Sequence, residues 1–145
     1  MIKAIREISV AVQDLDRAID TFRTKLGLEH EEIQHEPDPP IQSRFASFRI
    51  GDCSIALMES TGPGSPIERY LQSRGEGIFS VTLLVDGIAE ATERMREQGV
   101  EFVLDEAMVL ENIRAVDRVY GECLVNWTKP QALHGLVFEI QELRD

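Results

Sequence analysis

The fold is decided by residues 8–15, Ile-Ser-Val-Ala-Val-Gln-Asp-Leu, which lead from a strand pattern into the start of a helix. Apolar residues stand at every second position of the strand part, as in a strand with one buried face. Asp14 then has the short acceptor side chain that caps helices, and residues 15–26 repeat apolar residues at helical spacing. Gly27 follows where a left-handed residue ends a helix. The stretch therefore predicts a strand, a capped helix and a glycine stop.

A second copy of this pattern occupies residues 81–101, 73 positions later at the strand and 72 positions later at the glycine. Its strand is Val-Thr-Leu-Leu-Val at residues 81–85, Asp86 is its predicted helix cap and Gly99 is its predicted stop. Strand-like runs follow both helices, at residues 44–50 and 54–58 in the first copy and at residues 119–127 and 136–141 in the second. Each copy is therefore predicted to be a βαβββ module, which makes the fold class α+β.

The repeat also predicts the domain organisation. We expect one domain over residues 1–145, with module one at residues 1–61, a linker at 62–77 and module two at 78–145. Each module has one helix, which covers one face of its sheet and leaves the other face bare. We expect the two tandem βαβββ modules to form a curved half-barrel whose concave face is a cleft.

Two shorter segments have clear local signals. In the linker, Ser65 and Glu68 have the spacing of a capping box and Pro66 fits the first helical position, which predicts a short helix. Residues 35–40, His-Glu-Pro-Asp-Pro-Pro, contain three prolines, so they cannot be helix interior or central strand. We expect these residues to form a loop at a sheet edge or a cavity mouth.

Composition excludes several classes of protein. The 145 residues include 15 Lys and Arg against 26 Asp and Glu, and the resulting net charge of −11 disfavours binding to a phosphate backbone. The chain has no apolar run of the ~18 residues that a membrane span needs, and its charged N-terminus does not fit a secretory signal. Cys53 and Cys123 lack metal-ligand spacing. We therefore expect a cytoplasmic protein with a small-molecule ligand, and no nucleic-acid or membrane partner.

Strand alternation assigns residues to the predicted cleft. When Ile8, Val10 and Val12 pack under the first helix, Glu7 points to the opposite face. The same parity places Leu136, Phe138 and Ile140 in the core. The cleft-facing residues that follow from it include Glu7, Ala56, Met58, Ser80, Thr82, Glu139 and Gln141.

The repeat relates four of these cleft positions to one another. It pairs Glu7 with Ser80 and Ala56 with Glu139, so the four positions carry two carboxylates, a hydroxyl and a methyl group. Two carboxylates that converge in a partly apolar groove are typical of general acid–base chemistry, because burial raises the pKa of a carboxyl group. Glu7 and Glu139 are therefore the candidate catalytic residues.

Trp127 is the only tryptophan of the chain. An offset of 79 residues matches Trp127 to Phe48, which favours packing in the core. Stacking against a ligand in the cleft is the alternative role.

These motifs resemble the vicinal oxygen chelate superfamily, which includes glyoxalase I, extradiol dioxygenases, bleomycin resistance proteins and methylmalonyl-CoA epimerase. The resemblance rests on the doubled module, on residues 7–15 and on Val-Phe-Glu-Ile at residues 137–140. Residues 51–59 and 64–78 are similar to the epimerase branch.

The resemblance implies a divalent metal, Mg²⁺, Mn²⁺, Co²⁺, Ni²⁺ or Zn²⁺, on the four positions that match Glu7, Ala56, Ser80 and Glu139. Only Glu139 has the residue that the epimerase branch has at its position, and Glu7 offers another oxygen ligand. Ala56 has no donor atom and Ser80 has a weak one, which puts the metal in doubt. Residues 43–48 contain no carboxylate for the second catalytic base of the epimerases.

Two functions are open at this point, and a homodimer is implied by the resemblance. The first is an isomerase or lyase for a small oxygen-rich or acyl-thioester substrate, with Glu7 and Glu139 as catalytic residues and weak metal ligands. Its substrate-binding residues would be Ser80, Thr82, Ala56, Met58 and Trp127. The second is a metal-free protein of the same fold that sequesters a small molecule. A cleft that serves only dimerisation is a third alternative.

Overall fold

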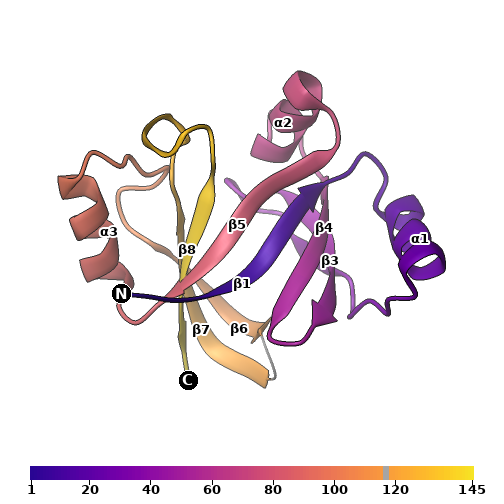
Figure 1. Ribbon diagram of the computed structural model, residues 1–145, viewed down its shortest axis with the longest axis horizontal. Helices are drawn as coiled ribbons and strands as arrows, with labels where there is room; N and C mark the ends of the chain where they lie inside the picture. Colours follow the sequence, from indigo (N-terminus) through magenta and orange to yellow (C-terminus); the bar gives the residue numbers. More distant parts are fainter. Residues whose placement is uncertain (116–117) are drawn as a thin grey trace. The chain divides into compact units, whose positions relative to one another are not determined.

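The computed structural model describes residues 1–115 and 118–145 (Figure 1). The chain divides into two compact units. The N-terminal unit consists of residues 7–79, and the C-terminal unit consists of residues 1–6 and 80–145. The division falls inside two strands, β1 (Ile2–Ala11) and β5 (Gly77–Val85).

The N-terminal unit has a four-stranded sheet in the order β2–β3–β4–β1. β1 runs parallel to β4, whereas β3 runs antiparallel to both of its neighbours. The other elements of this unit are α1 (Leu15–Leu26), β2 (Gln34–Glu36), β3 (Ser43–Ile50), β4 (Cys53–Ser60) and α2 (Pro66–Arg74). The order β1, α1, β2, β3, β4 confirms the first predicted βαβββ module.

Helix α1 covers one face of this sheet, as the alternation in residues 8–12 predicts. The core between them is apolar and consists of Val12, Leu15, Ile19, Ala46, Phe48 and Leu57, with Val10 and Ile55 packed against it. Asp14 caps the helix, because its Oδ1 accepts a hydrogen bond of 3.1 Å from the Arg17 backbone N–H. Gly27 ends it with a φ of 67°, the left-handed conformation that a glycine adopts without strain.

The linker helix α2 is confirmed with its predicted cap. Ser65 Oγ accepts a hydrogen bond of 3.0 Å from the Glu68 backbone N–H, and Pro66 is the first helical residue. The Glu68 carboxylate accepts in turn from the Gly64 backbone N–H at 3.1 Å. Residues 35 and 36, which we expected in a loop, belong to β2 instead. β2 lies at the end of the strand order, so the edge position is confirmed.

The C-terminal unit repeats the architecture with the order β5–β8–β7–β6. β5 runs parallel to β8, and β7 runs antiparallel to β8 and β6. Its other elements are α3 (Ile88–Glu97), β6 (Met108–Ala115), β7 (Arg118–Trp127), a 3₁₀ turn (Gln131–Leu133) and β8 (Phe138–Arg144). The second predicted βαβββ module is therefore confirmed.

Helix α3 packs on this sheet through a second apolar core, next to β8 in Figure 1. Val85, Ile88, Ala91, Phe102 and Ile140 are buried there, and Leu83 and Phe138 pack against them. Leu136 is not part of this core, contrary to the prediction: it lies before β8 begins and is 55% exposed.

The predicted cap of α3 is also wrong. Gly87 occupies the cap position, and the Asp86 side chain lies 3.4 Å from the Lys3 ammonium instead. The first helical N–H, that of Ile88, donates to the carboxylate of Glu142 on β8 at 2.8 Å. A distant carboxylate thus replaces the local cap, which the sequence around Asp86 does not indicate. No described helix is long and apolar enough to cross a membrane.

Candidate functional site

The face of the C-terminal sheet opposite α3 carries most of the predicted site residues. Strand pairing places Thr82 beside Glu139 and Trp127 beside Glu139, so the three side chains point to the same face. Ser80 and Gln141 join this face, because each lies two residues from Thr82 or Glu139 along its strand. We call the side chains of Ser80, Thr82, Trp127, Glu139 and Gln141 the β8 cluster.

Glu139 is the centre of the β8 cluster and is partly buried. Its Oε2 accepts a hydrogen bond of 2.8 Å from the indole Nε1–H of Trp127. Its Oε1 accepts one of 3.1 Å from the amide Nε2–H of Gln141. Each carboxylate oxygen therefore has a donor, and hydrogen bonds of this kind favour the ionised form of the group.

Two polar atoms of the β8 cluster are buried without a partner. Thr82 is fully buried and Gln141 is 4% exposed, and neither Thr82 Oγ1 nor Gln141 Oε1 has a hydrogen-bond partner within residues 1–115 and 118–145. A buried polar group without a partner costs about 1–3 kcal/mol of stability. Groups of this kind in a folded protein call for an explanation such as a ligand or an ordered water.

The register corrects our assignment of Trp127. Trp127 pairs with Glu139, and Ser47 pairs with Ala56, which is the repeat equivalent of Glu139. Trp127 therefore corresponds to Ser47 at an offset of 80 residues, and the predicted match to Phe48 at an offset of 79 is wrong by one residue. Matching bridges of His30 with Phe48 and of Phe102 with Thr128 confirm the new offset, because they pair Phe48 with Thr128. A shift of one residue moves a side chain to the other face, so Trp127 faces Glu139 and not the core.

The N-terminal unit holds the other predicted residues on the equivalent face. Glu7 accepts a hydrogen bond of 3.1 Å from Ser47 Oγ. Ala56 is fully buried on the same face, and Met58 follows it on β4. Glu7, Ala56 and Met58 thus share one sheet face, and Ser80, Thr82, Trp127 and Glu139 share another. That Glu7 and Glu139 act in a common cleft stays a prediction.

Two residues with roles in these clusters were missed as site residues. Gln141 was expected on the inner face but not as a donor to Glu139, although its position two residues along the strand is the signal for that contact. Ser47 was not considered, because its contact with Glu7 joins residues 40 positions apart and leaves no local trace in the sequence.

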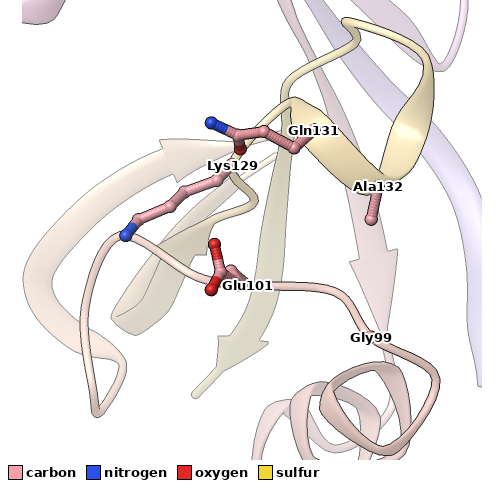
Figure 2. Close-up of a pocket in the computed structure, with 5 residues that line it drawn as sticks. All are labelled: Gly99, Glu101, Lys129, Gln131 and Ala132. Atoms are coloured by element: carbon pink, nitrogen blue, oxygen red, sulfur yellow. The ribbon is translucent and has the colours of Figure 1, made fainter.

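A pocket of about 290 Å³ lies at one end of the C-terminal unit (Figure 2). Its lining residues come from two loops and are Gly99, Glu101, Lys129, Gln131 and Ala132. The loops are joined by a backbone hydrogen bond of 2.8 Å from the Lys129 N–H to the Glu101 carbonyl oxygen. Lys129 and Glu101 are both exposed and opposite in charge, and none of the β8 cluster residues lines this pocket, so it does not assign a function.

Comparison with known proteins identifies a superfamily. The sequence model of the Glyoxalase/Bleomycin resistance protein/Dioxygenase superfamily matches residues 6–116. Ethylmalonyl-CoA/methylmalonyl-CoA epimerase of Cereibacter sphaeroides is 32% identical over 100 residues, which cover 68% of this chain and 73% of that protein. Mitochondrial methylmalonyl-CoA epimerase of Mus musculus is 27% identical over 106 residues, which cover 72% of this chain and 58% of that protein.

The solved structures give the same fold over the whole chain. A variant of Streptomyces coelicolor methylmalonyl-CoA epimerase in complex with 2-nitronate-propionyl-CoA superimposes with a TM-score of 0.85 over 100% of both chains, at 20% sequence identity. The predicted α+β fold, with its two βαβββ modules, is therefore confirmed.

Proposed function

Because this chain belongs to the Glyoxalase/Bleomycin resistance protein/Dioxygenase superfamily, we propose that it is an isomerase of acyl-CoA thioesters that removes the proton α to the thioester carbonyl. The two curated relatives described above are acyl-CoA epimerases by name, which supports this substrate class. Lyase chemistry on such a substrate would begin with the same proton removal.

The observation that carries the proposal is the state of Glu139. Its carboxylate is partly buried and both of its oxygens are held by donors, Trp127 and Gln141. A carboxylate that is ionised and fixed in direction is what a general base requires, because proton transfer depends on correct alignment. Glu139 is the base in this proposal.

The proposed step transfers one proton and leaves an enolate. The α C–H bond breaks, an O–H bond forms on Glu139, and the electron pair moves toward the thioester oxygen. The Thr82 hydroxyl, which is buried without a partner beside Glu139, is the donor that stabilises this oxygen in the proposal. Return of the proton to the opposite side of the α-carbon inverts it, and Glu7 is the predicted acid for that return.

The divalent metal of the superfamily does not fit the residues present. Ala56 offers no ligand atom, and Ser80 offers one neutral hydroxyl in place of a stronger ligand. Both oxygens of Glu139 already accept hydrogen bonds from protein donors. Within the described ranges, no group of three or more His, Cys, Asp or Glu side chains gathers in a way that could hold a metal ion. No step of the proposed reaction therefore depends on a metal.

The test is loss of the α-proton in D₂O, followed by NMR with methylmalonyl-CoA and propionyl-CoA. We expect exchange above the rate without enzyme, unchanged by a chelator. Glu139→Gln should reduce the rate by about 10²–10⁴-fold, because it removes the base. Thr82→Val keeps the shape but removes the donor and should reduce the rate by about 10²-fold.

Two outcomes contradict the proposal. One is that none of the acyl-CoA thioesters exchanges faster with the enzyme than without it. The other is that Glu139→Gln exchanges as fast as the unchanged protein. Glu101→Gln is the matched control, because Glu101 is an exposed carboxylate outside the β8 cluster.

A second candidate function is binding without turnover, and one observation favours it. A methyl group stands at the Ala56 position, and β3 (Ser43–Ile50) has no carboxylate to serve as a second base. Calorimetric binding of an acyl-CoA thioester, with no exchange of its α-proton, would support this candidate and overturn the first. The homodimer and the cytoplasmic location stay predictions, and light scattering of the purified protein checks the homodimer.

A further inference from the structure

The Gln141 side chain is arranged for Glu139 at the expense of its own hydrogen bonding. Its Nε2–H donates to Glu139 Oε1 at 3.1 Å, and this leaves the buried Oε1 of Gln141 without a partner. Turning the amide over would place its carbonyl oxygen against the carboxylate oxygen, which is repulsive. A methionine or leucine at this position would avoid the unpaired carbonyl, so stability does not account for a glutamine here.

Trp127 provides the second contact, from the neighbouring strand β7. Its indole N–H is a donor only, and it lies 2.8 Å from Glu139 Oε2. Trp127 also pairs with Glu139 in the strand register, which brings the ring alongside the carboxylate. The two donors thus approach different oxygens of Glu139 and restrict rotation of the carboxylate about its terminal bond.

The repeat gives an independent comparison. Ser47 is the equivalent of Trp127, and it donates to Glu7 at 3.1 Å, so this strand position serves the carboxylate of its module in both copies. Met58 is the equivalent of Gln141 at the offset of 83 residues that relates Ala56 to Glu139. A thioether cannot donate a hydrogen bond, so the second donor exists only beside Glu139.

We propose that Trp127 and Gln141 are positioning residues, which together hold the Glu139 carboxylate ionised and in one orientation. This inference rests on the proposed function, because it names the groups that prepare the proposed base. Neither residue touches the substrate in this account. Their effect on the reaction passes through Glu139.

The first experiment uses the fluorescence of Trp127, the only tryptophan, and needs no substrate. Glu139→Gln replaces a charged acceptor by a neutral one beside the indole N–H, so we expect a shift of the emission maximum or a change in intensity. The control Glu111→Gln, at an exposed position on β6, should leave the spectrum unchanged. Equal spectra for both variants and the unchanged protein would overturn the inference.

The second experiment separates positioning from structural support. Gln141→Met should keep or raise the melting temperature, because it removes the unpaired carbonyl, while kcat for α-proton exchange falls about 10-fold at unchanged KM. Trp127→Phe keeps an aromatic ring, loses the N–H and should show the same split between kcat and KM. Gln131→Met makes the same chemical change at an exposed position and should alter neither quantity.

Each result points to one conclusion. A lower melting temperature of Gln141→Met with unchanged kcat assigns Gln141 a structural role and overturns the inference. A changed Trp127 spectrum in Glu139→Gln, without any acyl-CoA exchange by the unchanged protein, supports the contact and contradicts the proposed function alone.

Discussion

The two units use one carboxylate in the same way and another in different ways. In the N-terminal unit, Glu59 on β4 accepts from the first N–H of α1, that of Leu15, at 2.6 Å. In the C-terminal unit, Glu142 on β8 accepts from the first N–H of α3, that of Ile88, at 2.8 Å. The two acids are 83 positions apart, which is the offset between β4 and β8.

The carboxylates on the opposite sheet faces differ between the copies. Glu7 lies on the first strand of its module, whereas Glu139 lies on the last strand of the other. Each copy thus keeps the acid that ties its helix to its sheet, but carries the second acid on a different strand. The comparison teaches that the duplicated architecture needs the first kind of acid and leaves the second kind to chemistry.

The largest expected effect comes from removing the two acids of the second kind. Glu139→Gln should abolish α-proton exchange to about 10²–10⁴-fold below the unchanged protein, since it removes the base. Glu7→Gln should retain exchange but lose inversion, because the proton then returns only by way of Glu139. NMR in D₂O measures exchange, and circular dichroism of one enantiomer of the thioester measures inversion. Loss of exchange and inversion in equal proportion in Glu7→Gln would show that Glu7 does not serve as the returning acid.

Strand faces could be predicted from the sequence, because alternation within one strand is a local property. Glu7 and Glu139 were placed on the correct faces in this way. The offset between copies is not local: it is 73 at the first strands, 80 at Trp127 and 83 at Glu139, because the connecting loops differ in length. An error of one residue in such an offset turned Trp127 from the carboxylate face to the core.

Helix caps show the same limit. Asp14 was predicted as a cap and is one, because its acceptor is three residues from its donor. Asp86 has the same local pattern, but Glu142 takes its place from 54 residues away from the donor. Nothing near residue 86 indicates this competition, and it becomes visible only when β8 is in place.

The next largest effect is expected from the acids that tie the helices to the sheets. Glu59→Gln and Glu142→Gln should each reduce the free energy of unfolding by about 1–2 kcal/mol, through loss of a charge-assisted hydrogen bond at a helix N-terminus. Chemical denaturation at pH 7 measures the loss. Glu93→Gln, at an exposed position within α3, is the matched control.

The Glu142 variant also makes a prediction about pH. Burial raises the pKa of Glu142, but hydrogen bonds from Arg144 and from the Ile88 backbone N–H together outweigh burial and lower it. A lowered pKa in the folded state means that the stabilisation is complete at neutral pH and is lost as the pH falls below the ordinary carboxyl value of about 4.3. The difference between the unchanged protein and Glu142→Gln should therefore shrink on acidification. A difference that stays constant from neutral to acidic pH would contradict this assignment.

A smaller effect distinguishes the two aspartates that precede the helices. Asp14→Ala should cost about 1 kcal/mol of stability, because it removes a real cap. Asp86→Ala should cost about 0.5 kcal/mol or less, since the Asp86 side chain is joined to Lys3 only in an exposed ion pair. Urea unfolding of both variants measures the difference. Equal losses would mean that Asp86 acts as a cap in solution.

The smallest effect concerns Glu36 on the edge strand β2, whose pKa shifts in the opposite direction from that of Glu142. Burial and the neighbouring Asp38 raise the pKa of Glu36, and His35 opposes them. A raised pKa in the folded state means that the protonated form favours folding at low pH, and that this advantage is lost as the pH rises through the folded value. Ionised Glu36 therefore costs stability at pH 7, so Glu36→Gln should raise the melting temperature slightly at pH 7 and leave it unchanged near pH 4. Glu32→Gln, at an exposed position before β2, should show no such dependence on pH. A lower melting temperature of Glu36→Gln at pH 7 would mean that the carboxylate stabilises the edge strand, and that the N-terminal unit depends on both of its buried acids.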